Sequence, residues 1–119
     1  MRLWITASVL AAAIVATACS VERSGDVHAG ATDTDAVRVA LHDDEFAPAT
    51  LELPAGEKVT VEIRNEGSNA HNFTIDRLDL STGTMTSSQV MTATFTVPDG
   101  TTEFHCTFHP GMTGTIVAT

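Results

Sequence analysis

The stretch VTVEIRNEGSNAHNFTI, residues 59–75, decides the fold of this chain of 119 residues. Val59, Val61 and Ile63 alternate with polar residues, and the same alternation returns after a turn. Alternation with a period of two is the pattern of a strand that buries one face. β-branched and aromatic side chains also favour strands. The turn, residues 65–69, consists of Asn, Glu, Gly and Ser. The stretch therefore predicts two half-buried strands joined by a turn.

The same alternation recurs on both sides of this stretch, and no segment carries a long apolar run at helical spacing. The predicted strands are residues 37–41, 59–63, 72–75, 92–97, 104–108 and 114–118. Turn signals rich in Gly, Pro and Asn separate them. Short strands punctuated by turns are typical of all-β sandwiches and barrels. We therefore expect one all-β domain over residues 37–119.

The N-terminus has the layout of an export signal. Residues 1–18 begin with the positive Arg2 and continue as an apolar run that ends in small residues. Cleavage after an A-x-A pattern is one interpretation. The other is a lipoprotein signal, in which Cys19 is lipidated and tethers the protein to a membrane; its weaker point is Ala16, where Leu is usual. We favour the lipoprotein, with residues 19–36 as a flexible tether and an exported, extracytoplasmic protein.

Charge and cysteine content narrow the classes of function. The net charge of −9 and the absence of a basic patch make nucleic acid an unexpected partner. The chain has two cysteines, so a lipidated Cys19 leaves Cys106 as the single thiol of the domain. A lone thiol in an oxidising compartment is reactive unless something holds it, and a metal ion would hold it.

The stretch FHCTFHPGM, residues 104–112, contains one Cys, two His and one Met, all of which can bind a metal ion. Cys106 shares its predicted strand face with Phe104 and Phe108, so alternation points all three inward. His71 starts another predicted strand with the parity of its buried residues, and so it is also expected to point inward.

Four soft or borderline metal ligands result from this arrangement: His71, Cys106, His109 and Met112. One thiolate, two imidazoles and a thioether are the ligands of a blue-copper electron-transfer site. Structural zinc sites usually take four ligands drawn from Cys and His, and a thioether suits Cu(I) better than zinc. The sequence therefore predicts one copper ion.

The chain from Val37 to Thr119 resembles the small cupredoxins of the plastocyanin, azurin and amicyanin kind. AGEKVTVEIRNEGSNAHNFTI resembles the family's strand, turn and first histidine ligand, and EFHCTFHPGM resembles its C-terminal ligand loop. The spacing of two residues between Cys and His, and two between His and Met, is most like amicyanin. The resemblance implies a Greek-key β-sandwich of about eight strands with one type 1 copper cycling between Cu(II) and Cu(I).

The resemblance also implies roles around the ligands. The Asn72 side chain would bond to Thr107 and tie the two ligand loops together. Electrons would pass near His109 through an apolar surface patch formed by Phe108, Pro110 and Gly111. The protein would be a monomeric electron carrier rather than an enzyme, and its partner a transient redox protein such as a cytochrome or an oxidoreductase.

Two alternatives compete with this reading. A copper chaperone, or a copper-resistance or storage module, would use the same ligands. His105 stands beside Cys106, as in copper nitrite reductases and multicopper oxidases, where such a residue bridges to a second copper. The position at which nitrite reductases carry a further histidine is Asp76, and His-x-His pairs are absent. We therefore expect His105 to be an outward-facing strand residue.

Overall fold

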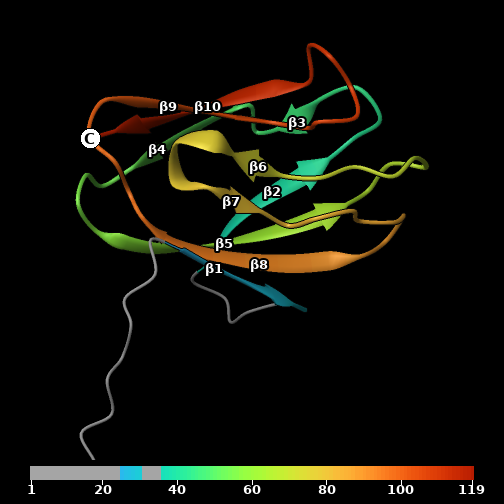
Figure 1. Cartoon of the computed structure of the whole chain (residues 1–119), viewed down its shortest axis with the longest axis horizontal. Coiled ribbons are helices and arrows are strands. Elements are labelled where there is room, and N and C mark those ends of the chain that lie inside the picture. The colour runs from blue at the N-terminus through green and yellow to red at the C-terminus, as the bar shows by residue number, and fades with distance from the viewer. Residues whose placement is uncertain (1–24, 31–35) are drawn as a thin grey trace, which may run out of the picture.

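The structure is a computed structural model that describes residues 25–30 and 36–119. Ten strands in these ranges form two sheets of five, with the orders β1-β8-β5-β2-β3 and β4-β10-β9-β6-β7 (Figure 1). The strands are Gly25–Ala29 (β1), Val37–Leu41 (β2), Phe46–Ala47 (β3), Thr50–Leu53 (β4), Lys58–Asn65 (β5), Thr74–Ile75 (β6), Leu80–Ser81 (β7), Val90–Thr96 (β8), Thr101–His105 (β9) and Thr113–Ala118 (β10). The predicted all-β Greek-key sandwich is confirmed.

The number of strands exceeds the expected eight because several are very short. β3, β6 and β7 span two residues each, and a 3-10 turn, Asp76–Leu78, connects β6 to β7. Strands of two residues cannot show an alternating pattern, so periodicity does not reveal them. Among the described residues, no helix is long and apolar enough to cross a membrane.

The structure corrects one prediction at the N-terminal side. Residues 25–29, expected within the flexible tether, form β1 and pair antiparallel with β8 from Gly25 opposite Phe95 to Ala29 opposite Met91. Backbone pairing with an existing sheet supplies the binding, and Val27 adds a half-buried side chain against the core. An edge strand held in this way needs no apolar alternation, which is why composition indicated a coil. The signal and Cys19 lie outside the described residues.

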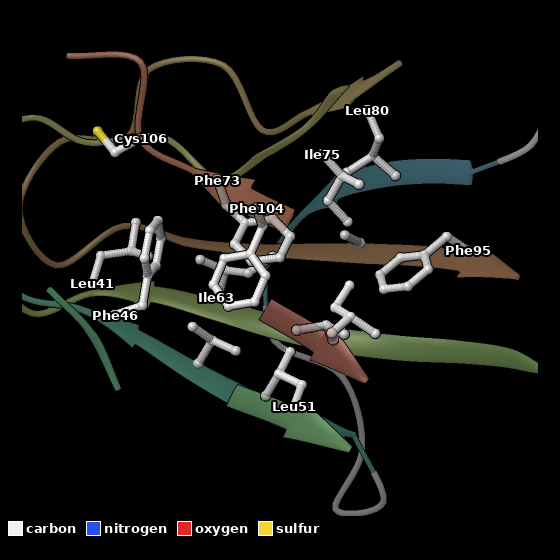
Figure 2. Close-up of a cluster of buried hydrophobic side chains, with 14 of the residues drawn as sticks. Leu41, Phe46, Leu51, Ile63, Phe73, Ile75, Leu80, Phe95, Phe104 and Cys106 are labelled. Atoms are coloured by element: carbon white, nitrogen blue, oxygen red, sulfur yellow. The ribbon is translucent and has the colours of Figure 1, made fainter. Parts of the chain in front are cut away.

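The core lies between the two sheets and is built around three phenylalanines (Figure 2). Phe46 meets Phe104 edge to face with ring centroids 4.9 Å apart, and Phe73 lies 4.9 Å from Phe104. Such arrangements suit the charge distribution of aromatic rings. Figure 2 shows Cys106 at one end of this buried group, with Phe95 at the other. Cys106 therefore lies at one end of the core.

Strand register gathers four loops at that end of the sandwich. Parallel pairing of β2 with β5 aligns Leu41 with Asn65, and β5 pairs antiparallel with β8, aligning Arg64 with Val90. In the other sheet, His105 of β9 lies opposite Thr113 of β10. The loops that follow β2, β5, β7 and β9 therefore lie together, away from the C-terminus (Figure 1).

Candidate metal centre

Three donor atoms converge at the loop end. The Nδ1 atoms of His71 and His109 are 3.1 Å apart, and Cys106 Sγ lies 3.8 Å from the first and 3.5 Å from the second. In the part of the chain that the structure describes, these residues form the one group of His, Cys, Asp or Glu side chains arranged to hold a metal ion.

The separations are close to those expected of three donor atoms that would share one metal ion. Bonds of about 2.0 Å to nitrogen and about 2.3 Å to sulfur, as known for zinc, would place the nitrogens about 3.5 Å apart in a trigonal plane. The same bonds would place sulfur about 3.7 Å from each nitrogen. The observed distances lie within about half an ångström of these values, and the donor set is that of type 1 copper.

His71 is fixed by backbone pairing before any ion is considered. It forms an isolated β-bridge with Met85, in which each N–H donates to the carbonyl of the other at 3.0 and 2.8 Å. Both side chains are fully buried. The imidazole is therefore buried, which agrees with the inward direction that strand parity predicts. Met85 belongs to the core.

The segment from Cys106 to Met112 is a closed turn. The Cys106 N–H donates to the Met112 carbonyl at 3.1 Å, and the Met112 N–H donates to the His109 carbonyl at 3.0 Å. Gly111 has a φ of 89°, a conformation that glycine adopts without strain. The Met112 side chain is buried in the same cluster as Cys106. The turn thus carries three of the four expected ligands.

Two hydrogen bonds join Asn72 to Thr107. Asn72 Nδ2 donates to Thr107 Oγ1 at 2.6 Å, and the Thr107 N–H donates to Asn72 Oδ1 at 3.0 Å. Asn72 follows His71, and Thr107 follows Cys106, so these bonds connect the loops that carry the two buried donors. Thr74 Oγ1 donates to the same Asn72 oxygen at 2.9 Å.

An acidic residue that sequence reasoning missed, Asp43, lies on the far side of the His71 ring. Its Oδ1 is 3.2 Å from His71 Nε2 and accepts hydrogen bonds from the N–H groups of Ser68 and Asn69. The Asn69 N–H, followed by the His71 side chain, holds the pKa of Asp43 below its ordinary value. No local sequence signal marks Asp43, because its contact with His71 depends on the pairing of β2 with β5.

The surface at this end is apolar around His109. Phe108 is 49% exposed and is the one exposed large hydrophobic residue in the described ranges. Pro110 and Gly111 are exposed, and His109 is half-buried. Alternation had pointed Phe108 inward, which is wrong because β9 ends at His105 and the chain then turns.

His105 lies apart from the three donor atoms. Its Nε2 is 2.8 Å from Asp76 Oδ2, a contact on the partly exposed side of β9. This arrangement agrees with a residue that faces away from Cys106. In the described structure, the side chain of His105 thus contacts the carboxylate of Asp76.

The fold and the donor set define a small blue-copper domain, and the comparisons agree. A family model described as a cupredoxin-like domain matches residues 8–118, so the chain belongs to this family. A reduced Cu(I) form of an amicyanin variant superimposes with a TM-score of 0.66 and 25% identity, covering 81% of this chain and 99% of that one. One type 1 copper ion is the cofactor that this family and these residues fit.

Two further solved structures share the fold. Amicyanin from Paracoccus versutus gives a TM-score of 0.65 at 23% identity, covering 82% of this chain and 100% of that one. Reduced auracyanin from Roseiflexus castenholzii gives 0.63 at 21% identity, covering 71% of this chain and 96% of that one. Among curated protein sequences no match was found.

Proposed function

We propose that this protein carries single electrons between extracytoplasmic redox partners by means of one type 1 copper ion. The observation that carries the proposal is the convergence of His71 Nδ1, Cys106 Sγ and His109 Nδ1 within 4.8 Å of one another. A bound copper ion supplies the one-electron couple of Cu(II) and Cu(I).

Each ligand residue has a distinct role in this proposal. Cys106 provides the thiolate, and His71 provides an imidazole that is closed off from solvent. His109 provides the second imidazole and, being half-buried, brings the site close to the surface. Met112, whose side chain is buried in the same cluster as Cys106, would provide the thioether. The hydrogen-bonded turn and the β-bridge hold these side chains in place, so little rearrangement accompanies a change of charge.

The exposed patch of Phe108, Pro110 and Gly111 suits brief encounters with a redox protein such as a cytochrome or an oxidoreductase. Electron-transfer complexes bury small areas and dissociate readily. The patch lies beside His109, the ligand nearest to solvent, so a docked partner would approach the metal closely. We propose a monomeric carrier.

A carrier is favoured over an enzyme by the closed ligand set. Catalytic metal sites keep a position open for water or substrate. In this proposal four protein ligands would occupy the ion, and three of those side chains are buried. The N-terminal signal pattern supports export, and Cys19 supports attachment to a membrane through lipid.

The decisive experiment is a visible and EPR spectrum of the copper-loaded domain, followed by a redox titration. We expect an intense thiolate-to-Cu(II) absorption near ~600 nm and a reversible one-electron couple. Cys106→Ser should abolish the band. A colourless oxidised copper protein, or an unchanged band in Cys106→Ser, would contradict the proposal.

The same sample separates a carrier from a chaperone or storage module. A carrier retains copper against a competing chelator while exchanging electrons quickly with a cytochrome in stopped flow. A chaperone releases copper readily to an acceptor and exchanges electrons slowly. The backbone hydrogen bonds within the turn from Cys106 to Met112 favour retention of copper, because they hold the ligand residues in place.

A further inference from the structure

Asp43 contacts His71 at the ring nitrogen that faces away from the other donors. Its Oδ1 lies 3.2 Å from His71 Nε2, 2.8 Å from the Ser68 nitrogen and 3.0 Å from the Asn69 nitrogen. The last two groups are backbone N–H donors. One oxygen of the Asp43 carboxylate therefore contacts three nitrogens of the segment from Ser68 to His71: two backbone N–H groups and one ring nitrogen.

This contact selects the tautomer of the His71 imidazole, that is, which ring nitrogen carries the proton. An ionised carboxylate only accepts hydrogen bonds, so the Nε2 of His71 must carry the proton. In a neutral ring the other nitrogen, Nδ1, then has a free lone pair. Nδ1 is the atom that points at Cys106 Sγ and His109 Nδ1. The carboxylate therefore prepares the ring to bind a metal before the metal arrives.

The surrounding loop is shaped to admit this carboxylate. A Cβ at Gly67 would overlap Asp43 Oδ1 and would lie 3.1 Å from His71 Nε2. The buried side chain of Asn65 fixes the loop, because its Oδ1 accepts from the Gly67 N–H at 3.0 Å and its Nδ2 donates to the Asn69 carbonyl at 2.9 Å. The glycine thus leaves the space that the carboxylate fills.

We propose that Asp43 is a positioning residue of the copper site, which sets the tautomer of His71 and favours Cu(II) over Cu(I). A hydrogen-bonded carboxylate makes the imidazole a stronger electron donor, and such partners tune the metal they never touch. A negative charge behind the ring also stabilises the more positive ion. Asp43 therefore lowers the reduction potential. This inference rests on the proposed type 1 copper function.

The test compares Asp43→Asn with Asp44→Asn. Both variants remove one negative charge from adjacent, exposed positions, and the contact with His71 belongs to Asp43. Asparagine keeps an oxygen that can accept from Ser68, Asn69 and the ring, so the loop should persist. In a redox titration and a copper competition assay, Asp43→Asn should raise the reduction potential and weaken Cu(II) binding about tenfold. Asp44→Asn should leave both within error of the parent protein.

A second measurement needs no copper. ¹⁵N NMR of the metal-free protein should show His71 as a single tautomer with its proton on Nε2. Asp43→Ala, which removes the acceptor, should yield a mixture of tautomers. A proton on Nδ1 in the parent protein, or equal shifts of potential in Asp43→Asn and Asp44→Asn, would overturn the inference. Absence of the blue band in the parent protein would instead refute the proposed function. The NMR result would still show whether Asp43 sets the tautomer of His71, because that measurement uses the metal-free protein.

Discussion

Replacing Asn72 with alanine tests how firmly the two ligand loops are tied. The change removes two bonds to Thr107, of 2.6 and 3.0 Å, and one of 2.9 Å from Thr74. A hydrogen bond contributes a net 0.5–1.5 kcal/mol or so, giving roughly 1.5–4.5 kcal/mol for three. Thr107 is exposed and Thr74 keeps a contact with Ser81, so water and that hydroxyl compensate in part. We expect a loss of about 2–3 kcal/mol.

Two substitutions at Thr107 calibrate this figure. Thr107→Val removes the acceptor for Asn72 Nδ2 and keeps the backbone N–H bond to Asn72 Oδ1, so it should cost about 1 kcal/mol. Thr107→Ser keeps both hydrogen bonds and should lower the free energy of unfolding by only a few tenths of a kcal/mol or so. The expected order of stability is therefore the parent protein, Thr107→Ser, Thr107→Val and Asn72→Ala.

Urea unfolding of the metal-free proteins, followed by circular dichroism, measures these differences. Copper must be absent because a ligand that binds only the folded state adds stability of its own. For a domain of this size, about 2–3 kcal/mol corresponds to a fall in Tm of roughly 10–20 °C. Redox titration of the copper-loaded variants then shows whether the loosened loops alter the site.

A loss of stability in Asn72→Ala no greater than that in Thr107→Val would contradict this prediction. That outcome would mean that the side chain of Asn72 contributes through a single bond. An unchanged reduction potential in Asn72→Ala, together with an unchanged visible band, would show that the tie has no influence on the copper site.

Two further predictions concern the strands around the site. Gly114→Ala should cost about 1–3 kcal/mol, because a Cβ there would overlap the ring of the fully buried Phe104; thermal unfolding measures this, with Thr113→Ala as an exposed control that should change stability little. A stable Gly114→Ala would contradict the close packing. His105→Ala should leave the blue band and a stoichiometry of one copper per chain unchanged, since His105 pairs with Asp76; loss of copper by elemental analysis would assign it a metal role.

Much of the fold could be predicted because its central strands bury one face. Val61 and Ile63 in β5, like Ala93 and Phe95 in β8, are apolar core residues at every second position, although their polar neighbours Glu62 and Thr92 are buried as well. The four expected ligands could be chosen for the same reason, since parity and spacing select soft side chains from the polar background. Periodicity works where a strand is long and has two unlike faces.

The rest depends on tertiary contacts that local pattern does not contain. β1 is held by backbone bonds to its neighbour, so its side chains carry little signal. Phe108 turns outward because the strand ends three residues earlier, and alternation gives no warning of an end. Asp43 reaches His71 from a separate loop, 28 positions away in the chain. Each of these required the pairing of strands to be known.

If Cys19 carries a lipid, the way β1 joins the sheet would determine which end of the domain faces the membrane. Gly25 pairs with Phe95, at the end of β8 remote from the ligand loops, and Ala29 pairs with Met91 nearer to them. The six Cα-to-Cα steps from Cys19 to Gly25 can span at most about 22 Å. A lipid on Cys19 would then be connected, through this short segment, to the end of the sandwich opposite the ligand loops. The patch around His109 would then point outward, into the space where diffusing partners arrive.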